Sequence, residues 1–473
     1  MEKLIFVNSN IFLPKDHLST QNVMQNIAGN SGNSYITYSV IKMIYGEFVD
    51  VNDIKNIWLT KYNKTTAEEI NKSYDKVILI LQDNLRINDS YYKHDIYEDA
   101  IKFFEKIKLP IVVFSLGSNS FGTKLNIKKL KKSLIKFLQI ISHKTESFGV
   151  RGEYTQEILE KIGIKNATVT GCPSYFETGP NRKVIKSYHK NKKLLIGGFV
   201  SNRYVNDCES HLILQDEEKY IKLLMGSYIK DSDLEGCHYK SHDKEIVNLY
   251  LKKRIHFFVN MDQWKSFIKD KNFSFYIGTR VHGSIMAINS GIVPIVTNQD
   301  FRSKEMCDLF KIPNIDLGYE DDIFEIYQNI DVNKINKEYN KLFNKFSEWI
   351  ELNGLKINKE FYKNSQEDKK LDNKHLNIYS SYSKRYDLLV SSVHEKTINN
   401  DIKKHQNIVF KIELKVIKIL CCFVPTRKYR KTLRNEGIVK LNKFLGRFVA
   451  SFVFNKEKRK NIRKYFIYIS DVG

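Results

Sequence analysis

Ser274-Phe-Tyr-Ile-Gly-Thr-Arg-Val-His-Gly-Ser-Ile-Met-Ala-Ile-Asn-Ser-Gly-Ile-Val-Pro-Ile-Val-Thr297 decides the fold of this chain, because it joins a strand pattern, a helix pattern and a second strand pattern. The strand patterns are the short apolar runs Phe273–Ile277 and Val293–Val296, and the residues between them alternate in size as in a tightly packed helix. Arg280 and His282 fall at the first strand-to-helix turn, where parallel α/β folds place their chemistry. The stretch therefore predicts an anion-binding crevice that Arg280 and His282 face.

The same alternation of strands and helices occupies the first 180 residues. The expected strands are Leu4–Val7, Lys76–Leu81, Ile111–Ser115, Ser147–Val150 and Ala167–Thr170. The helices expected between them lie near Ser34–Tyr45, Tyr97–Ile107, Lys128–Ser142 and Tyr154–Ile162. Such alternation predicts a mostly parallel sheet with helices on both faces.

A linker rich in Gly, Pro, Asn and Lys, Gly179–Lys193, separates this half from a second half with the same pattern. Its expected strands are Leu194–Val200, Ile255–Val259, Phe273–Ile277, Val293–Thr297 and Asn314–Leu317. Its expected helices lie near Glu217–Ile229, Lys244–Lys253, Trp264–Lys269, Val281–Asn289 and Arg302–Lys311. A helical span, Asp321–Tyr362, follows and could cross back over both halves.

The length of 473 residues exceeds the roughly 250–300 residues over which one hydrophobic core grows. We therefore expect an α/β protein of two Rossmann-like domains facing across a cleft, as in glycosyltransferases of the B type. The expected limits are 1–180 for the first domain (acceptor side), 190–335 for the second (donor side), 336–370 for crossover helices and 371–473 for a basic, mainly helical tail.

The net charge of +23 is concentrated in the tail, where residues 401–473 hold 19 Lys or Arg against five Asp or Glu. Within it, 437–454 places Ile438, Leu441, Leu445, Phe448 and Phe452 on one helical face and basic residues on the other. A basic amphipathic helix of this kind, preceded by the apolar run Val416–Pro425, predicts that residues 416–464 bind an anionic membrane surface. A helix that packs on the catalytic domains is the alternative.

The six cysteines show no pair spacing typical of zinc, and they are expected to be reduced, buried thiols. The chain begins with a strand pattern where a signal peptide would have a long apolar core, and no run reaches the roughly 18 apolar residues that cross a bilayer. These features predict a cytoplasmic protein, peripherally associated with the inner face of the plasma membrane through its tail.

Four short motifs within roughly positions 1 to 350 carry a family resemblance. They are Gly29-Asn-Ser-Gly-Asn33; Phe148-Gly-Val-Arg-Gly-Glu-Tyr-Thr155, followed by Gly163 and Thr170-Gly-Cys-Pro-Ser174; Ile277-Gly-Thr-Arg-Val-His-Gly283; and Asp300-Phe-Arg-Ser-Lys-Glu305. Together they resemble the polysaccharide pyruvyl transferase family, whose most diagnostic motif is similar to the third. The basic tail lies outside this resemblance.

The resemblance implies transfer of pyruvate from phosphoenolpyruvate to two hydroxyls of one sugar, which makes a cyclic ketal. It implies an acceptor that is an intermediate of a capsular, exopolysaccharide or lipopolysaccharide glycan, often linked to a lipid diphosphate. The chemistry that the resemblance implies does not demand a metal, so we expect no metal and no cofactor beyond phosphoenolpyruvate as co-substrate.

The donor carries a carboxylate and a phosphate, which planar arginine donors bind better than lysine does. Arg280 is the first candidate. His282, whose ordinary pKa lies near neutrality, could protonate the methylene carbon of the donor or bind the departing phosphate; a purely structural histidine is the alternative. The other expected donor-side residues are Gly278, Thr279, Gly283, Asp300 and Arg302.

Glu305 follows the expected strand Val293–Thr297, as Asp300 and Arg302 do, and should open into the same cleft. It could bind acceptor hydroxyls or act as a base. The alternative is a salt bridge within the first turn of its helix.

Acceptor-side residues are expected at strand-end loops and turns of the first half. The glycine loop precedes a helix and could form an anion nest. Arg151 and Glu153 follow the strand Ser147–Val150, although capping of the next helix is an equal reading for Glu153. The expected acceptor-side set is Gly29, Asn30, Gly32, Asn33, Ser118, Asn119, Arg151 and Glu153.

Two other functions fit the same sequence. A sugar-nucleotide-dependent glycosyltransferase of surface polysaccharide synthesis could use Arg280 and Glu305 to grip a diphosphate and a ribose. A non-catalytic membrane or nucleic-acid binding protein would need only the clustered basic residues of the tail. No recognised nucleic-acid module accompanies that tail, so we expect no nucleic-acid partner.

Overall fold

The computed structural model describes most of the chain up to residue 358. The described residues are 2–8, 23–24, 27, 29–46, 56–57, 64–87, 95–119, 124–186, 193–198, 208–224, 249, 253–298, 300–316 and 322–358. The chain divides into two compact units, of which the first comprises 1–13, 27–215 and 258–369, and the second 14–26, 216–257 and 370–473. Every site residue considered below belongs to the first unit.

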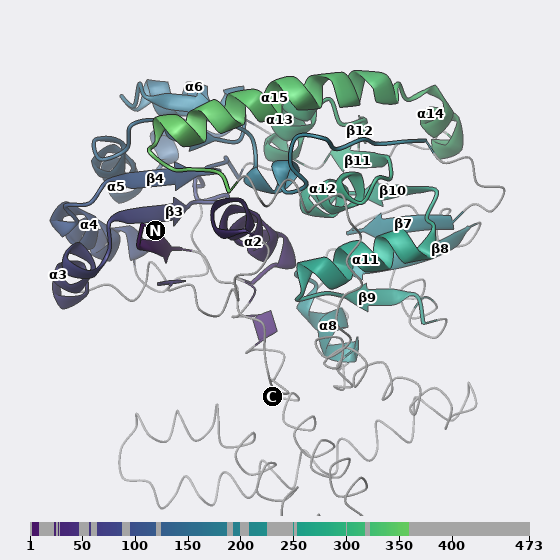
Figure 1. Cartoon of the computed structure of the whole chain (residues 1–473), viewed down its shortest axis with the longest axis horizontal. Helices are drawn as coiled ribbons and strands as arrows, with labels where there is room; N and C mark the ends of the chain where they lie inside the picture. The colour runs from purple at the N-terminus through teal and green to yellow at the C-terminus, as the bar shows by residue number, and fades with distance from the viewer. Residues whose placement is uncertain are drawn as a thin grey trace, which may run out of the picture. The chain divides into compact units, whose positions relative to one another are not determined.

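The first sheet is parallel and lies in the N-terminal half (Figure 1). Its strand order is β2 (Asn56–Ile57), β1 (Leu4–Val7), β3 (Lys76–Ile80) and β4 (Ile111–Phe114). A bridge between Leu116 and Val150 links its β4 side to a parallel pair, β5 (Phe148–Val150) and β6 (Ala167–Val169). The runs that form β1, β3 and β4 are buried throughout, as strands covered on both faces must be.

Amphipathic helices cover this sheet. The helices of this half are α2 (Ser31–Tyr45), α3 (Lys64–Ser73), α4 (Ile96–Lys106), α5 (Lys132–Ser142) and α6 (Glu153–Lys161), with a 3-10 turn η3 (Ile127–Lys129). Phe104 of α4 meets Phe137 of α5 edge to face, with ring centroids 5.5 Å apart. Their buried faces join the strands in one hydrophobic core.

The second sheet has six strands in the order β12 (Asn314–Asp316), β11 (Pro294–Asn298), β10 (Phe275–Gly278), β7 (Lys193–Gly197), β8 (Glu209–Leu214) and β9 (Ile255–Phe257). The strand pairings from β12 to β8 are parallel. The helices of this half are α8 (Glu218–Leu224), α11 (Met261–Lys271), α12 (Val281–Asn289), α13 (Phe301–Phe310) and α14 (Ile323–Asn329). The C-terminal end of β10 is unusually tight, because a Cβ on Gly278, at φ 154°, would lie 2.0 Å from the Gly197 carbonyl oxygen.

The long helix α15 (Val332–Leu352) runs along both halves of the first unit (Figure 1). Near its end, Trp349 packs edge to face on Phe114 of β4 at 5.0 Å. Earlier in the helix, Tyr339 lies against Tyr175 of the turn η4 (Pro173–Phe176), which connects the two halves. Tyr175 in turn stacks on Phe310 of α13 at 3.8 Å. This aromatic cluster fastens the connecting segment and α13 to α15.

The predicted α/β class with parallel sheets is confirmed, and the bounds of β1 and α12 are as predicted. The sequence reasoning missed β2, α3, η4 and β8. The predicted helix 244–253 lies almost wholly outside the described residues, as do the tail 371–473 and its segment 416–464. The four predicted domain limits stay predictions.

Two further expectations concern the described residues only. Cys172 and Cys307 are free and buried as expected, whereas Cys208 is only half-buried. Among the helices of the described ranges, none combines the length and the apolar character that crossing a membrane requires.

Candidate active site

The candidate site is built at the carboxyl ends of parallel strands from both sheets. In the first half, Asp83 follows β3, Ser115 follows β4 and Arg151 follows β5. In the second half, Arg280 follows β10 and Asp300 follows β11. This is the sheet edge at which α/β proteins bind ligands.

Arg151 is the most unusual side chain of this edge, because it is a buried arginine, only 1% exposed. Its Nε donates to the Ser115 hydroxyl at 3.1 Å, but no acceptor among the described residues pairs with its buried Nη2. Burial lowers the pKa of the Arg151 guanidinium, and the neighbouring Cys172, Asp83 and Glu305 only partly offset this. An unpaired buried donor on a cation is costly unless a ligand binds it.

Arg302 lies between two carboxylates. Its Nη1 is 3.1 Å from an oxygen of Asp83, and its Nη2 is 3.1 Å from an oxygen of Asp300. Asp300 also caps α13, since it accepts a hydrogen bond from the Ser303 amide at 2.7 Å. Burial raises the pKa of Asp83, but the charges of Arg302, Arg86 and Arg151 outweigh burial and hold it below its ordinary value. Asp83 is therefore ionised at neutral pH.

His282 lies where the starts of α2 and α12 meet. A Cβ added to Gly32 of α2 would come within 2.8 Å of the His282 Cβ and Nδ1, so only glycine allows this approach. On its other side, the His282 Nε2 is 3.5 Å from the Cys172 sulfur. Burial lowers the pKa of His282 well below its ordinary value, and the charges of Arg151 and Arg302 lower it further. The imidazole is therefore neutral at pH 7.

Glu305 reaches from α13 to the start of α6. One carboxylate oxygen accepts from the Thr155 amide at 3.0 Å and the other from the Thr155 hydroxyl at 2.8 Å. Burial raises the pKa of Glu305 to about 7, although the Thr155 hydrogen bonds and Arg151 oppose the rise. The carboxylate thus contacts a residue 150 positions away in sequence, whereas the alternative reading placed it in a salt bridge within its own helix. A carboxyl that titrates near neutrality suits proton transfer.

Arg280 is the N-cap of α12 and is half-buried. Its side chain lies beside Gly198 at the end of β7, where a Cβ would be 3.0 Å from the Arg280 Cγ. Thr279 lies there too, since its amide donates to the Gly197 carbonyl at 2.9 Å. The strongest charges acting on His282 come from Arg151 and Arg302 rather than from Arg280. Gly278 and Gly283 of this motif serve close packing, the latter against Tyr276.

The acceptor-side set does not form one cluster. Asn30 caps α2 by accepting from the Gly32 amide at 2.7 Å, and Gly29 supplies the preceding turn at φ 73°, while Asn33 lies inside α2. Asn119 instead joins the charged site, because its side chain donates to Asp83 at 2.8 Å. The buried Ser118 amide donates to the Thr155 hydroxyl at 3.1 Å. Glu153 is the exposed first residue of α6, and the first-turn amide of Thr155 donates to Glu305, while the N-cap residue Gly152 provides no side chain.

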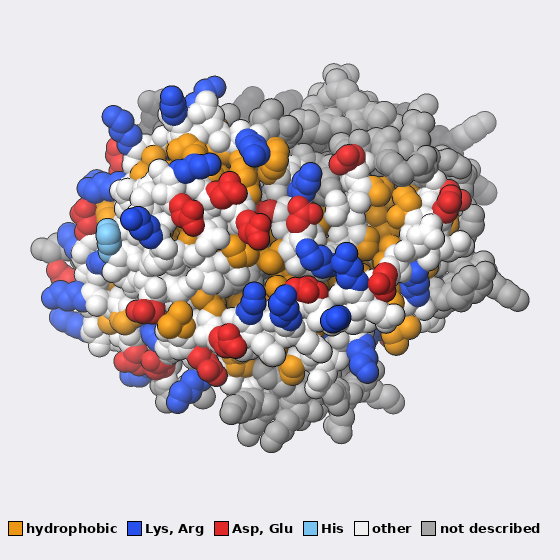
Figure 2. All heavy atoms as spheres, turned by 90° about the horizontal axis from the view of Figure 1, so that it is seen from above, with side chains coloured by type: hydrophobic (Ala, Val, Ile, Leu, Met, Phe, Trp, Pro, Cys, Tyr) orange, Lys and Arg blue, Asp and Glu red, His pale blue; other side chains and the backbone are white. Residues whose placement is uncertain are grey.

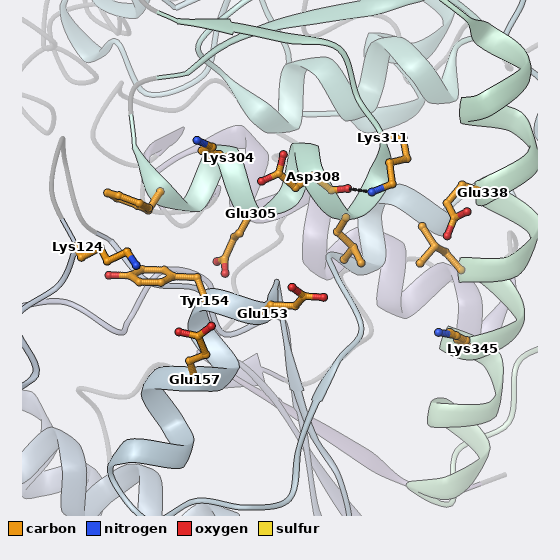
Figure 3. Close-up of a pocket in the computed structure, with 13 residues that line it drawn as sticks. Lys124, Glu153, Tyr154, Glu157, Lys304, Glu305, Asp308, Lys311, Glu338 and Lys345 are labelled. Atoms are coloured by element: carbon orange, nitrogen blue, oxygen red, sulfur yellow. Dashed lines mark hydrogen bonds between the residues drawn. The ribbon is translucent and has the colours of Figure 1, made fainter.

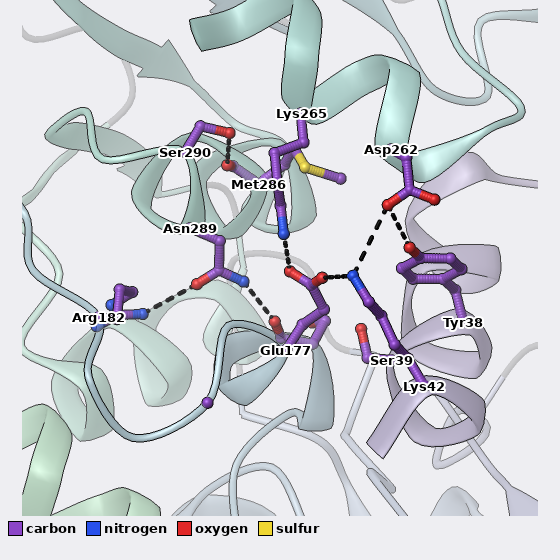
Figure 4. Close-up of polar contacts among 12 residues, drawn as sticks. Tyr38, Ser39, Lys42, Glu177, Arg182, Asp262, Lys265, Met286, Asn289 and Ser290 are labelled. Atoms are coloured by element: carbon purple, nitrogen blue, oxygen red, sulfur yellow. Dashed lines mark hydrogen bonds and ion pairs between the residues drawn. The ribbon is translucent and has the colours of Figure 1, made fainter. Parts of the chain in front are cut away.

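A second polar cluster, the Glu177 network, lies deeper in the first unit (Figure 4). Glu177 follows η4 and is 1% exposed; it accepts from Lys42 of α2 at 2.8 Å and from Lys265 of α11. Burial raises the pKa of Glu177, but Lys265 and Lys42 outweigh burial and lower it to about 2. Tyr35 completes the network, since its hydroxyl donates to Glu177 at 3.4 Å and accepts from Asn289 at 2.8 Å.

The sequence reasoning missed Asp83, Cys172 and Glu177 as members of these clusters. Asp83 was within reach, because it follows a predicted strand exactly as the Ser115 loop does. Glu177 carried no signal of that kind. Within the described ranges, no group of three His, Cys, Asp or Glu side chains is placed to hold a metal ion.

No curated protein sequence matches this chain. Its similarity to solved structures is illustrated by three of them. HepE from Anabaena, in complex with UDP, is 9% identical with a TM-score of 0.37, over 74% of this chain and 97% of that chain. UDP-GlcNAc 2-epimerase from Methanocaldococcus jannaschii is 12% identical with a TM-score of 0.36, over 73% and 99%. UGT73P12 from Glycyrrhiza uralensis, with glycyrrhetinic acid 3-O-monoglucuronide, is 8% identical with a TM-score of 0.29, over 86% and 99%.

A family model described as polysaccharide pyruvyl transferase matches residues 30–301. The match covers more than half of the 473 residues. It begins at the N-cap of α2 and ends at the first residue of α13, so it includes Arg151, Arg280 and His282. Arg302 and Glu305 lie just beyond it.

Proposed function

Because this chain belongs to the polysaccharide pyruvyl transferase family, we propose that it transfers pyruvate from phosphoenolpyruvate to a sugar of a cell-surface glycan intermediate, forming a cyclic ketal. The observation that carries the choice of donor is the buried guanidinium of Arg151, whose Nη2 has no acceptor among the described residues. A small, doubly anionic donor supplies the missing acceptor and the missing charge.

The donor-binding group of this proposal is Arg151 together with His282 and Arg302. Arg302 already binds Asp83 and Asp300, so it holds these two carboxylates in place at the site. The neutral His282 imidazole can offer a ring N–H to a phosphate oxygen, but it is not the acid at pH 7. The sequence placed Arg151 among the acceptor-side residues because it follows a strand. Here we assign it to donor binding instead.

Proton transfer falls to Glu305. The reaction adds one proton to the methylene carbon of phosphoenolpyruvate while the first acceptor hydroxyl attacks the neighbouring carbon and loses its proton. The second hydroxyl then attacks the same carbon, the bond to the phosphate oxygen breaks, and the departing phosphate takes up the second hydroxyl proton. A carboxyl with a pKa of about 7 can both give and take a proton at physiological pH, whereas His282 is already neutral there.

Titration calorimetry tests this proposal. It measures the affinity of phosphoenolpyruvate for the wild-type protein and for the variants Arg151→Lys and Arg151→Met. Loss of one charge-assisted hydrogen bond should weaken binding roughly 10- to 100-fold in Arg151→Met. Arg151→Lys should fall between, because lysine keeps the charge and loses the planar fork. Ketal formation is checked by the mass of a glycan acceptor.

Arg182 offers the matched control, because it is another buried arginine whose Nη2 lacks a partner among the described residues. Its guanidinium lies between the rings of Tyr175 and Tyr339, at 4.1 and 3.7 Å from their centroids. Arg182→Met should therefore bind phosphoenolpyruvate normally. Turnover with a sugar nucleotide and none with phosphoenolpyruvate would overturn the proposed donor.

The membrane attachment and cytoplasmic location are proposed from the sequence of the tail alone. The basic and apolar faces of residues 437–454 support them. Co-sedimentation with vesicles that contain phosphatidylserine should require residues 416–464, and binding to duplex DNA at the same salt concentration should be weaker.

A further inference from the structure

A pocket of about 500 Å³ opens between α6, α13 and α15, beside the candidate active site (Figure 3). This volume exceeds that of a single pyranose ring and suits a small polar ligand. All its lining residues are described and belong to the first unit. None of the functions proposed above uses the pocket as a whole.

The lining mixes both signs of charge in nearly equal number. Its cationic residues are Lys124, Lys304, Lys311 and Lys345, and its acidic residues are Glu153, Glu157, Glu305, Asp308 and Glu338. Figure 2, which looks down on the side of α15, likewise shows Lys and Arg interspersed with Asp and Glu rather than separated. The carboxylates disfavour a polyanion and the lysines disfavour a polycation. The pocket therefore suits a ligand that is uncharged or zwitterionic.

Several of these charged groups are not engaged with one another. Lys124, Lys304 and Lys345 form no ion pair within the part of the chain that the structure describes, and neither does the Glu153 carboxylate. Lys311 only donates to the Asp308 backbone carbonyl, at 2.7 Å. The pocket thus presents ammonium donors and carboxylate acceptors side by side, which is the pairing that neighbouring sugar hydroxyls use, since each hydroxyl both donates and accepts.

An aromatic pair supplies the apolar part of the lining. The half-buried rings of Tyr154 on α6 and Phe301 on α13 lie 5.2 Å apart at an interplanar angle of 31°. The Tyr154 hydroxyl accepts a hydrogen bond from the Leu125 amide, which holds the ring in place. A fixed ring with a polar surround can pack against the C–H face of a pyranose.

The pocket shares one wall with the proposed active site. Glu305 lines it, and Figure 3 shows its side chain pointing from α13 toward α6, close to Tyr154 and Glu153. The same carboxyl is influenced by Arg151 and by Asp300. A saccharide in the pocket would therefore lie next to the group to which we assign proton transfer.

We propose that this pocket is a saccharide subsite, which binds an uncharged or zwitterionic sugar unit of the acceptor glycan. Its role in the acceptor rests on the proposed function, while the saccharide binding itself does not. Lysines and carboxylates from α6, α13 and α15 bind the hydroxyls, and Tyr154 with Phe301 packs against the ring. The specificity of the enzyme for one glycan then depends on residues of α6, α13 and α15 that are not part of the proposed donor-binding group.

Saturation-transfer NMR tests the subsite directly, with methyl glycosides of glucose, galactose, mannose and N-acetylglucosamine as probes. At least one should receive saturation from the wild-type protein. Tyr154→Ala should weaken its binding roughly 3- to 10-fold through the lost ring contact. Because Tyr154→Ala also removes packing, Glu157→Gln and Lys345→Ala, both at exposed positions, serve as the second pair of variants and should weaken binding without unfolding.

Matched controls lie on the same helices, outside the pocket. Glu160→Gln on α6 and Lys337→Ala on α15 are exposed changes of the same kind and should leave the NMR signal unchanged. Phosphoenolpyruvate binding should be unaffected in all pocket variants. Sugar binding without phosphoenolpyruvate binding would reject the proposed donor and keep the subsite. No saturation of any probe, or equal binding in pocket and control variants, would overturn the subsite.

Discussion

Glu177 and Glu305 are both buried carboxyl groups of the first unit, yet their surroundings are opposite. Glu177 accepts hydrogen bonds from two lysines, and its pKa falls to about 2. Among the described residues, Glu305 accepts hydrogen bonds only from the neutral Thr155, and its pKa rises to about 7. Burial is therefore not what separates a structural carboxylate from a reactive one in this protein. The nearest donors separate them, because two lysine cations compensate the lost hydration of a carboxylate more fully than the neutral donors of one threonine do.

The same contrast holds for the cations. Lys42 and Lys265 both form ion pairs with Glu177. The Nη2 of Arg151 has no acceptor among the described residues. In the Glu177 network the buried charges neutralise one another, whereas the candidate active site keeps a buried guanidinium donor without an acceptor among the described residues. An anionic substrate that binds at the candidate active site can supply the acceptor that this guanidinium lacks.

The largest expected effect comes from neutralising the closed network. Glu177→Gln removes the buried carboxylate that Lys42 and Lys265 share and leaves the part-exposed Asp262, 3.7 Å from Lys42, as the nearby acid, so it should lower the free energy of unfolding by about 3–5 kcal/mol. Urea denaturation followed by circular dichroism measures this. The matched change, Glu305→Gln, should cost less than about 1 kcal/mol at pH 7, since half of the Glu305 side chains are already neutral there. Equal losses in the two variants would contradict the comparison.

Acid should weaken the protein through Glu177. Its folded pKa of about 2 lies below the ordinary 4.5, so the folded state binds fewer protons than the unfolded state between these values. The resulting stabilisation, about 3 kcal/mol, is present above pH 4.5 and is lost as the pH falls toward 2. Denaturation midpoints across this range should decline less steeply in Glu177→Gln.

Glu305 should change the stability in the opposite direction, so that the protein becomes less stable as the pH rises. Its folded pKa of about 7 lies above the ordinary 4.5, so the folded state binds more protons in this range. Its ionisation should therefore remove up to about 3 kcal/mol of stability as the pH rises from 4.5 through 7. In Glu305→Gln that decline should be absent. A stability curve identical to that of the wild type between pH 5 and 8 would show that Glu305 is not the group described.

Thr155→Val tests the surroundings of Glu305 with a smaller expected loss of stability. Valine keeps the shape but removes the hydroxyl that donates to Glu305 and accepts from the Ser118 amide, a loss of about 1–2 kcal/mol. Because the Thr155 hydrogen bonds lower the pKa of Glu305, the pH-dependent decline should move to higher pH. Thr145→Val is the control: it removes a buried hydroxyl bonded to the Ile141 carbonyl and should leave the decline in place.

The smallest effect on stability is expected for Arg151→Met, within about 1 kcal/mol of the wild type in either direction, because an incompletely paired buried charge contributes little to folding. The wild type should gain about 2.7 kcal/mol from phosphoenolpyruvate at 100 times its Kd, and Arg151→Met at the same concentration should gain far less. Thermal denaturation with and without the donor measures both quantities. A large loss of stability without ligand would place Arg151 among the structural groups.

The strand ends illustrate how far prediction from sequence reaches. Arg280, Asp300 and Arg151 were placed correctly at the ends of parallel strands, because apolar runs and turn residues mark those ends locally. The strand β8 was missed, since its residues Glu209–Leu214 begin with a polar half. The helix α3, Lys64–Ser73, was missed because it is largely polar. Weakly patterned segments of this kind take their structure from the sheet or helices they join.

The sequence by itself determined the parallel α/β class, the motifs shared with the family, and the residue types gathered at the strand ends. Only the tertiary structure decided which of those side chains are ionised and which of them have a partner. Glu177 meets Lys42 and Lys265 across 135 and 88 residues, and Glu305 meets Thr155 across 150. Ionisation depends on burial and on distances of a few ångströms between side chains, and folding sets both for residues that no local pattern connects.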